Sequence, residues 1–521
     1  MNPKQLTATK GAIVSEEPLN SRLLIVSNRL PVVLDQSETG DWLVQPGSGG
    51  LVTAMAPVLK HRGGIWIGWA GTVAEGGNTL ENVLAAKTQK FGYTLKPVHL
   101  TSDEKEKYYE GFANEIIWPL FHDFTSHCNF RPEYWLAYQR VNQKFAGAIT
   151  QNMRHNDFIW VHDYHLMTVA RELHAMGVTS KIAFFLHIPF PPLDILVRLP
   201  WRFEILHALL EYDLIGFQTF RDRRNFVHCV RTLLKGLRIE GRGQVNSMRL
   251  DNREIRVGVF PNSIDFREFA KSAATQEVSD RAWYIHEDIP KQKIILGVDR
   301  LDYTKGIPER LEAYRSALKK FPELQENTTL IQVVVPSRRS IPKYASLKTE
   351  IERLVGEING QFTRSGWVPI HYIFRSLERP ELLAYYRTAE IALITPLKDG
   401  MNLVAKEYCA CCLENTGVLI MSEFAGAAAQ LQKYALLVNP HDIEGIAEAI
   451  YRAFKMDSDE TKWRMRRLRQ IIRKYDIFWW VDSFLTTAFA KDLSAFPLLQ
   501  DYVPEENVAM PIPSQVKLEH Q

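Results

Sequence analysis

The sequence predicts an α/β protein built from two doubly wound, mostly parallel sheets. Short apolar runs recur along the chain, segments with helical periodicity fill the intervals, and polar or Gly/Pro residues follow the runs. This alternation starts afresh after the Pro261-Asn262 turn, and a chain of 521 residues has room for roughly two such units. We therefore expect one domain at residues 21–264, a second at 265–475 and a helix at 476–492 that crosses back to the first. Residues 1–20 and 493–521 are expected to be a disordered segment and a tail.

The composition narrows the class of function. The 63 basic and 60 acidic residues leave a net charge of +3, which gives no electrostatic footprint for nucleic acid. The five cysteines suit a reducing compartment, and Cys409, Cys411 and Cys412 fit small core residues better than a metal site. We see no signal peptide and no run of about 18 apolar residues. We therefore expect a cytoplasmic protein that does not contact a membrane.

Polar groups directly follow several predicted strands in the first half of the chain. The buried run from Arg22 to Asn28 places Arg29 at a strand end, where ligands collect in open α/β sheets. A glycine-rich turn at 47–50 precedes a predicted helix, so that Gly50 would let a ligand approach the backbone, although simple loop chemistry explains the turn more readily. Tyr109 and Trp118 fit a core better than a binding role unless the fold places them at a cleft.

Two further strands end in histidines. The run Phe158 to Val161 leads into His162-Asp163-Tyr164-His165, and the run Ala183 to Leu186 leads into His187 and a proline-stiffened loop. A metal site made of His162, Asp163 and His165 is an alternative, but neighbouring residues in one turn rarely converge on one ion. His187 is either a ligand-facing group or an ordinary buried histidine, and the pattern leaves both open.

Cations follow the strands of the second half. Arg300 and Lys305 follow the run Lys293 to Val298, and they form either a two-point clamp for an anion or a solvated loop. Arg338 follows the run Thr329 to Val335 in the same way. A basic helix over 462–474 is expected to present a solvated face.

The stretch from Leu393 to Tyr408 is the centre of the predicted site. An apolar strand stops at Pro396 and a helix begins after Asp399-Gly400, so the backbone N–H groups of residues 401–403 would form an anion site. Glu407 lies about two turns beyond Asp399, and carboxylates suit sugar or ribose hydroxyls. The pattern indicates a nucleotide sugar with its diphosphate at the helix start, and a plain capped helix is the alternative.

Seven motifs between residues 22 and 492 together resemble the trehalose-6-phosphate synthase family. In chain order they are SNRLPV, GSGGL, YYEGFANEIIWPLFH, WVHDYHL, FFLHIPFP, DRLDYTKGIPERL and DGMNLVAKEY. The resemblance implies two facing Rossmann-like domains of the GT-B type, with an acceptor-binding N-terminal domain, a nucleotide-sugar-binding C-terminal domain and the active site in the cleft between them. It also implies retaining transfer of glucose from a nucleotide-glucose, UDP-glucose first, to glucose 6-phosphate.

The same resemblance assigns residues to each substrate. For the donor they are Gly50, His187, Arg300, Lys305, Asp399, Gly400, Met401, Asn402, Leu403, Val404 and Glu407. For the acceptor they are Arg29, Tyr109, Trp118, Asp163 and Arg338. The catalytic set is Asp163, His187, Arg300, Lys305 and Asp399. Glu407 is expected on the ribose and Asp399 on the transferred glucose.

The implied chemistry is front-face attack, in which the leaving diphosphate takes the acceptor proton. Asp163 is the only candidate for a carboxylate nucleophile in a double displacement. The scheme requires no metal and no other cofactor. Lys398 stands where the family often has Arg, and this change leaves the main-chain anion site intact.

Several questions stay open at the level of sequence. A related transferase with glycerol 3-phosphate or a cyclitol phosphate as acceptor is the alternative enzyme, and a catalytically idle sugar-phosphate sensor is the alternative outside enzymes. No DxDxT-like phosphatase motif follows Asp492, so we expect a separate phosphatase to act on the product. The residues do not decide the nucleotide base, the regulation or whether the chain forms a homo-oligomer.

Overall fold

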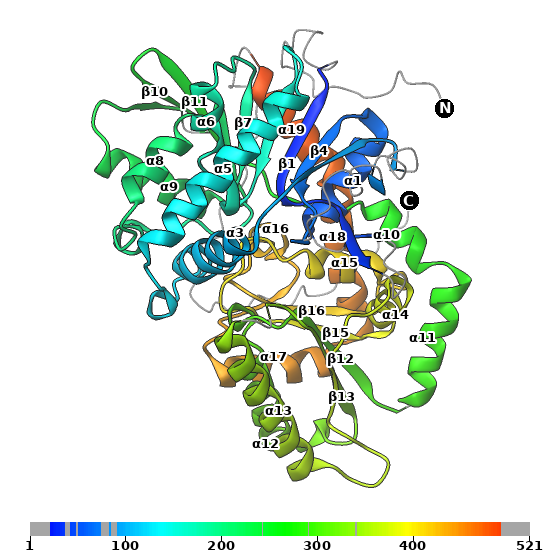
Figure 1. Ribbon diagram of the computed structural model, residues 1–521. Helices are drawn as coiled ribbons and strands as arrows, with labels where there is room; N and C mark the ends of the chain where they lie inside the picture. Colours follow the sequence, from blue (N-terminus) through cyan, green and yellow to red (C-terminus); the bar gives the residue numbers. More distant parts are fainter. Residues whose placement is uncertain are drawn as a thin grey trace.

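The computed structural model describes residues 21–36, 42–47, 50–73, 83–84, 91–241, 243–289, 291–338 and 341–490. Two α/β units lie one above the other, and each has helices packed around a largely parallel sheet (Figure 1). The predicted fold class is therefore confirmed. The segment 1–20 and the tail 493–521 that the sequence predicts lie outside the described residues.

The sheet of the N-terminal unit has nine strands in the order β5-β4-β1-β6-β7-β8-β11-β10-β9. The strands are β1 (Leu23–Arg29), β4 (Ile65–Trp69), β5 (Thr94–Val98), β6 (Phe158–His162), β7 (Ile182–Phe185), β8 (Leu214–Phe217), β9 (Arg238–Glu240), β10 (Val245–Leu250) and β11 (Arg253–Val259). All pairs from β5 to β11 are parallel, whereas β10 pairs antiparallel with both β11 and β9. A separate antiparallel ribbon joins β2 (Val32–Gln36) to β3 (Trp42–Pro46). The sequence did not predict β5, β9, β10 or this ribbon.

The sheet of the C-terminal unit has six strands in the order β14-β13-β12-β15-β16-β17. They are β12 (Lys293–Arg300), β13 (Thr328–Val335), β14 (Ile370–Ile373), β15 (Ile391–Ile394), β16 (Val418–Ser422) and β17 (Leu436–Val438), and every neighbouring pair is parallel. The chain runs outward from β12 in one direction and from β15 in the other, so the strand order reverses between them. The corresponding reversal in the N-terminal sheet lies between β1 and β6.

Helices cover both faces of each sheet. In the N-terminal unit they are α1 (Gly50–Arg62), α3 (Ser102–Glu104), the π-helix η2 (Lys105–Ile117), α4 (Trp118–Phe121), α5 (Pro132–Asn152), α6 (Val169–Ala175), α7 (Leu193–Leu196), α8 (Arg202–Leu209) and α9 (Phe220–Leu233). In the C-terminal unit they are α10 (Phe266–Ala273), α11 (Gln276–Asp288), α12 (Ile307–Lys320), α13 (Pro342–Phe362), α14 (Arg379–Thr388), α15 (Leu403–Cys411), α16 (Ala428–Leu431), α17 (Ile443–Lys455) and α18 (Ser458–Lys474). The apolar residues form separate cores on the two faces of each sheet. The central strands therefore read as continuous apolar runs, which is why the sequence predicted them.

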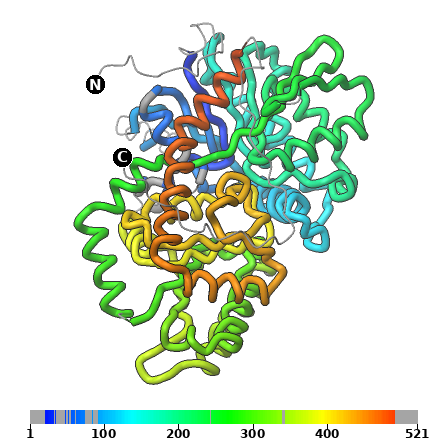
Figure 2. The backbone as a smooth tube through the Cα atoms, turned by 180° about the vertical axis from the view of Figure 1, so that it is seen from behind, coloured from blue at the N-terminus to red at the C-terminus, as the bar shows by residue number. Residues whose placement is uncertain are grey.

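The last helix, α19 (Ile477–Phe489), returns to the N-terminal unit. Figure 2 shows it in red along that unit, directly after the orange α18 of the C-terminal unit. The ring of Phe484 stacks on Trp160 of β6 at 4.2 Å, and the indole of Trp480 donates a hydrogen bond to the Phe260 carbonyl (3.0 Å). The chain thus crosses twice between the units, once after β11 and once between α18 and α19.

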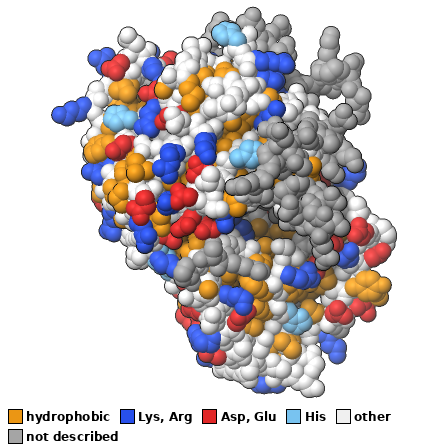
Figure 3. Space-filling model, in the orientation of Figure 1, with side chains coloured by type: hydrophobic (Ala, Val, Ile, Leu, Met, Phe, Trp, Pro, Cys, Tyr) orange, Lys and Arg blue, Asp and Glu red, His pale blue; other side chains and the backbone are white. Residues whose placement is uncertain are grey.

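The basic helix has the predicted solvated face, formed by Arg466, Arg467, Arg473 and Lys474, but it also packs inward. Two arginines of α18 turn inward: Arg464 is buried, and Arg469 donates to the carbonyl oxygens of Cys409, Ala410 and Cys412 at 2.7–2.9 Å. The helix is therefore a packing element with one basic face, and the three cysteines are buried as expected. On the side of the molecule seen in Figure 3, positive and negative side chains are interspersed. No helix in the described part of the chain is both long enough and apolar enough to span a membrane.

Candidate active site

The predicted site residues lie at the points where the strand order of each sheet reverses. Arg29 ends β1 and Asp163 follows β6 in the N-terminal unit, while Arg300 ends β12 and Asp399 follows β15 in the C-terminal unit. The carboxyl ends of strands at such a reversal are the usual ligand crevice of an open α/β sheet. The structure thus builds the site from two facing crevices.

The two units meet closely at Gly400. A Cβ atom at this position would lie 2.3 Å from the His187 carbonyl oxygen and 2.7 Å from the Cα of Ile188. Only glycine fits against this backbone. The side chain of Met401 extends the contact, because its sulfur lies 3.2 Å from Nδ1 of His187.

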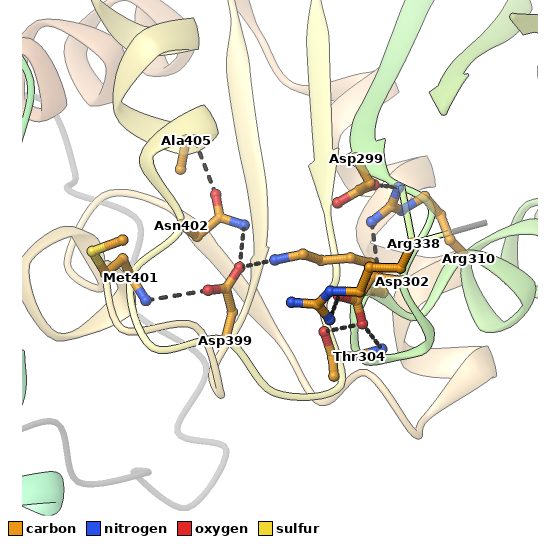
Figure 4. A network of polar contacts seen from close by, with 10 residues as sticks. Asp299, Asp302, Thr304, Arg310, Arg338, Asp399, Met401, Asn402 and Ala405 are labelled. Carbon is orange, nitrogen blue, oxygen red and sulfur yellow. Dashed lines mark hydrogen bonds and ion pairs between the residues drawn. The ribbon is translucent and has the colours of Figure 1, made fainter. Parts of the chain in front are cut away.

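Asp399 is held by three partners from the C-terminal unit (Figure 4). Its Oδ1 accepts the Met401 amide (3.2 Å), and its Oδ2 accepts the Asn402 side chain (3.2 Å) and the Lys305 ammonium (2.5 Å). Burial alone would raise the pKa of Asp399, but the lysine and the amide outweigh it and hold that pKa below its usual value. The group is therefore an ionised carboxylate at neutral pH.

The helix after Asp399 begins with Leu403, and Asn402 is its N-cap. The Asn402 side chain accepts the Ala405 amide at 3.1 Å, from a backbone with φ of 67° that asparagine tolerates. The Met401 amide is occupied by Asp399, so it is not free as the sequence predicted. The amides of Asn402, Leu403 and Val404 donate to no protein acceptor within the described ranges. The unpaired amides at the start of α15 therefore lie one residue further along the chain than the sequence predicted, and such amides suit an anion.

Glu407 lies further along α15 and is partly buried. Its Oε2 accepts a hydrogen bond from the Tyr386 hydroxyl (3.0 Å), and burial raises its pKa. One carboxylate oxygen is left to accept hydrogen bonds from a diol. Gly50 is the first residue of α1, but residues 48–49 of the glycine-rich turn lie outside the described part of the chain.

Three arginines gather around Tyr109 of the π-helix η2. Burial alone would raise the pKa of the Tyr109 phenol. Its pKa is instead lowered, because the guanidinium groups of Arg338, Arg29 and Arg300 act on it together. These cations come from both units, so a phosphate placed among them would be held across the crevice.

The Arg29 side chain is positioned by aromatic rings and by a glycine. Its guanidinium lies 4.1 Å from the centroid of the Trp69 ring and 5.5 Å from that of Tyr109. Gly71 has φ of 96°, and a Cβ atom there would lie 1.9 Å from Nη1 of Arg29. The absence of a side chain at Gly71 therefore makes the space for the guanidinium.

Trp118 lies between the arginines of the C-terminal unit. The guanidinium carbon of Arg338 is 4.2 Å from its ring centroid and that of Arg300 is 5.8 Å away. Arg338 also contacts Tyr344 (2.6 Å), the hydroxyl of Tyr164 (3.4 Å) and Asp302 (3.4 Å). The indole N–H of Trp118 is buried and has no partner in the part of the chain that the structure describes. It can therefore donate to a sugar or phosphate oxygen.

Hydrogen bonds join Asp163 and His187, which follow the neighbouring strands β6 and β7. The amide of Asp163 donates to the Phe185 carbonyl (2.8 Å), and the amide of His187 donates to Oδ1 of Asp163 (3.2 Å). Burial raises the pKa of Asp163 to about 7, although the amides of Tyr164 and His187 and two arginines oppose it. Burial also lowers the pKa of His187 to about 3, so its imidazole is neutral.

Two residues of this site have backbone conformations that non-glycine residues rarely adopt. Asp163 has φ of 75° and ψ of 166°, a region that is almost restricted to glycine. Arg338, with φ of 47°, is also in the left-handed half of the map. The surrounding hydrogen bonds and packing must hold these conformations, which is typical of functional residues.

The sequence reasoning missed several residues of the site. Asp302 is buried, and although burial raises its pKa, Arg338, Arg300 and Lys305 lower it further, so it is the counter-charge of the cationic cluster. Tyr164 joins Asn114 to Arg338 through its hydroxyl. His165 stacks on Tyr109 at 5.9 Å. The sequence could have indicated Asp302, because this carboxylate lies between Arg300 and Lys305 in one loop. The contacts of Tyr164 and His165 depend on tertiary packing, so the sequence does not show them. No cluster of three or more His, Cys, Asp and Glu side chains that could hold a metal is found among the described residues.

Comparison with known proteins decides the family. The model for glycosyltransferase family 20 matches residues 21–489. The chain belongs to this family. It is accordingly a glycosyltransferase.

Two relatives illustrate the range of the family. A "Bifunctional trehalose-6-phosphate synthase/phosphatase" from Thermoproteus tenax is 41% identical over 478 residues, which are 89% of this chain but only 63% of that longer protein. A "Trehalose-6-phosphate synthase" from Mycobacterium leprae is 40% identical over 471 residues, which are 89% of this chain and 94% of the relative.

Solved structures agree with the fold. An α,α-trehalose-phosphate synthase (UDP-forming) from Burkholderia xenovorans in complex with glucose-6-phosphate is 34% identical, has a TM-score of 0.80, and the match covers 90% of this chain and 100% of that one. A protein from E. coli bound with UDP-2-fluoro glucose is 35% identical with a TM-score of 0.79, over 90% of this chain and 99% of that one. Both matches extend over the two units, which supports the GT-B arrangement.

Proposed function

We propose that this enzyme is an α,α-trehalose-6-phosphate synthase that transfers glucose with retention from UDP-glucose to glucose 6-phosphate. One arrangement carries the proposal: two groups of possible anion ligands border the crevice between the units, at which Asp163 and His187 also lie. One is the arginine cluster around Tyr109, and the other is the start of α15 with Lys305. A sugar phosphate and a nucleotide sugar are the pair of substrates that fits two such sites.

The arginine cluster is the acceptor site. Arg29 of the N-terminal unit and Arg338 of the C-terminal unit each have a planar guanidinium that can bind a phosphate. Both guanidinium groups lower the pKa of Tyr109. The unpartnered indole N–H of Trp118 can donate to the same ligand. The Burkholderia relative, whose structure is a complex with glucose-6-phosphate, supports this acceptor.

The start of α15 is the donor site. The amides of residues 402–404 and the cations Arg300 and Lys305 surround the place for the diphosphate. Asp399 accepts hydroxyl hydrogen bonds of the transferred glucose, and Glu407 accepts those of the ribose. The E. coli relative bound with UDP-2-fluoro glucose supports a uridine donor.

The reaction follows from charge and position. The bond from the anomeric carbon to the diphosphate oxygen breaks, the acceptor hydroxyl oxygen forms the new bond on the same face, and its proton passes to the leaving diphosphate. Arg300, Lys305 and the helix start stabilise the charge that develops on the diphosphate. Asp163 holds the acceptor hydroxyl, and the two units fix the distance between the substrates. Because protein groups supply this charge stabilisation, the scheme uses no metal or other cofactor.

A finer set of expectations accompanies this proposal. We expect the enzyme to work in the cytoplasm, without nucleic acid or a membrane as partner, and a separate phosphatase to act on the product. Association into a homo-oligomer stays a prediction that sedimentation analysis can check.

The test is a substrate panel with the purified protein. Nucleoside diphosphate release is measured for UDP-, ADP- and GDP-glucose with glucose 6-phosphate, glycerol 3-phosphate or a cyclitol phosphate. We expect release that depends on glucose 6-phosphate and is fastest with UDP-glucose. Release with another acceptor, but not with glucose 6-phosphate, would point to the related transferase, and no release with any pair would contradict enzymatic function.

Arg300→Ala tests the donor site within the same assay. We expect turnover to fall by about 10²–10³-fold, because one charge on the leaving group is lost. Arg364→Ala is the control, since this exposed arginine precedes the amino end of β14, whereas the site lies at the carboxyl ends of the strands. Near-normal turnover of Arg300→Ala at saturating substrates would contradict the assigned role.

A further inference from the structure

His162 is the last residue of β6, and the proposed reaction assigns no role to its side chain. Its Nδ1 lies 3.1 Å from Nε2 of His187, and the two rings are nearly stacked, with an angle of 26° between their planes. The His162 ring is fully buried, whereas His187 faces the donor side through Nδ1 and the sulfur of Met401 (3.2 Å). The two histidines therefore form a short chain that leads from the core to the site.

The packing around His162 is aromatic and rigid. Its ring centroid lies 4.8 Å from that of Trp160 on the same strand and 6.4 Å from that of Trp480 on α19. Burial lowers the pKa values of both His162 and His187, so the pair is neutral and shares one hydrogen between Nδ1 and Nε2. Two arrangements of that hydrogen are available, and they give His187 different tautomers.

The other ring nitrogen of His162 distinguishes the arrangements. Nε2 of His162 is buried and has no hydrogen-bond partner within the described residues. If His187 donated to His162, the hydrogen of His162 would lie on Nε2 as a buried N–H group without an acceptor. If His162 donates from Nδ1, only a lone pair stays unpaired at Nε2. Unpaired buried N–H groups are rarer in proteins than underused acceptors, so the second arrangement is favoured.

We propose that His162 is a positioning residue that donates its Nδ1 hydrogen to Nε2 of His187 and thereby keeps the hydrogen of His187 on Nδ1. His187 then presents an N–H donor at the place where Met401 meets the crevice. Thioether sulfur is a weak acceptor, so a hydroxyl of the donor glucose readily replaces it as the partner of this N–H. The inference rests on the proposed function, because it gives His187 its task on the transferred sugar.

A matched pair of substitutions tests the hydrogen bond. His162→Asn keeps an N–H donor at the δ position, and His162→Leu has a similar size without one. We expect His162→Leu to lower kcat with UDP-glucose by about 10–100-fold, the range known for metal-binding histidines that lose the partner that orients them. His162→Asn should recover most of this loss. His162→Phe keeps the aromatic packing and replaces the leucine variant if that variant does not fold.

Two further readouts separate positioning from a general effect on the fold. The affinity for UDP, which lacks the sugar, should be unchanged in the Asn, Leu and Phe variants. In a His187→Ala background, His162→Leu should cause no additional loss of kcat, because His162 acts only through His187.

The outcomes are distinguishable from failure of the proposed function. If the wild-type enzyme transfers no glucose, the proposed function is wrong. If the wild type is active, normal kcat in both His162→Leu and His162→Phe would overturn the positioning role. An asparagine variant as slow as the leucine variant, or additive losses in the His187→Ala background, would overturn it as well.

Discussion

The ammonium of Lys305 lies 2.5 Å from the carboxylate of Asp399, and each side chain is only 13% exposed. Lys305 belongs to the turn after β12 and Asp399 to the loop after β15, so the pair joins the two strands that flank the reversal of the C-terminal sheet. An ammonium has three N–H donors and a carboxylate has about four acceptor positions. The pair can therefore hold a diphosphate oxygen and a sugar hydroxyl while its members remain in contact.

The first prediction concerns this ion pair. Asp399→Asn keeps the shape of the side chain but removes its charge, so we expect kcat/KM for UDP-glucose to fall by about 10²-fold or more while KM for glucose 6-phosphate changes little. The combined Lys305→Ala and Asp399→Asn variant should lose less than the product of the single losses. Initial rates at varied donor concentration check this. Glu448→Gln, which removes one of the two surface partners of Lys320, serves as the control, and its rates should equal those of the wild type.

The second prediction concerns the space for Arg29. Gly71→Ala would place a Cβ atom 1.9 Å from Nη1 of Arg29, so the guanidinium must move and KM for glucose 6-phosphate should rise by about tenfold or more. Gly177→Ala is the matched control, because Gly177 has φ of 79° with no atom within 4 Å of the added Cβ. Both variants place an alanine at a backbone with positive φ, so both carry the same kind of strain. Only the Cβ atom of Gly71→Ala clashes with Arg29. Equal KM values in the two variants would argue against Arg29 as an acceptor ligand.

The third prediction concerns the pH dependence that Asp163 causes. Its pKa is about 7 in the folded protein, and the ordinary value in an unfolded chain is about 4. Between these two pH values Asp163 is protonated in the folded protein and ionised in the unfolded chain. The contribution of Asp163 to the free energy of unfolding therefore falls as the pH rises from about 4 to about 7, and it stays constant above pH 7. Asp163→Asn should therefore gain stability relative to the wild type over this range. Denaturant unfolding at pH 5 and pH 8 checks the sign.

Activity should show the opposite trend. Only the ionised carboxylate of Asp163 can accept a hydrogen bond from the reacting hydroxyl of glucose 6-phosphate through both of its oxygens. The kcat/KM of the wild type should therefore rise as the pH passes about 7. Asp163→Asn should be slow and lack this rise. A wild-type profile that is flat between pH 6 and pH 8 would contradict the assigned protonation state.

The fourth prediction concerns stability away from the crevice. Arg469 of α18 donates to three carbonyl oxygens at the C-terminal end of α15, and a cation there also suits the helix dipole. Arg469→Ala should lower the free energy of unfolding by about 2 kcal/mol, the scale of hydrogen bonds to a charged group. Arg467→Ala, at an exposed position of the same helix, should change it by less than about 0.5 kcal/mol. Thermal unfolding of the two variants side by side measures the difference.

The sequence was most informative where burial is simple. Strands such as β6 and β12 are covered on both faces and read as unbroken apolar runs, and the predicted runs Phe158 to Val161 and Lys293 to Val298 lie within them. β9 and β10 lie at the edge of the sheet with mixed burial, and their pattern carries no such signal. The sequence did not predict the π-helix η2, because its wider turn leaves no mark in a short pattern.

The site was predictable in part for the same reason. Arg29, Asp163, Arg300 and Asp399 could be placed at strand ends from the apolar runs alone, and the helix start after Gly400 followed from its local sequence. The meeting of Arg29 with Arg338 around Tyr109 depends on how the two units face each other. The contact between His162 and His187 likewise depends on the alignment of β6 with β7. Such relationships join distant segments, and local patterns do not contain them.

The most direct test of the proposed reaction is the stereochemistry of the product. The purified enzyme is incubated with UDP-glucose and glucose 6-phosphate, and the anomeric protons are followed by NMR as UDP is released. We expect one UDP for each disaccharide phosphate and an α configuration at the transferred glucose, linked to the anomeric oxygen of the acceptor. A β-linked product, or release of UDP without a new glycosidic bond, would contradict retaining transfer to glucose 6-phosphate.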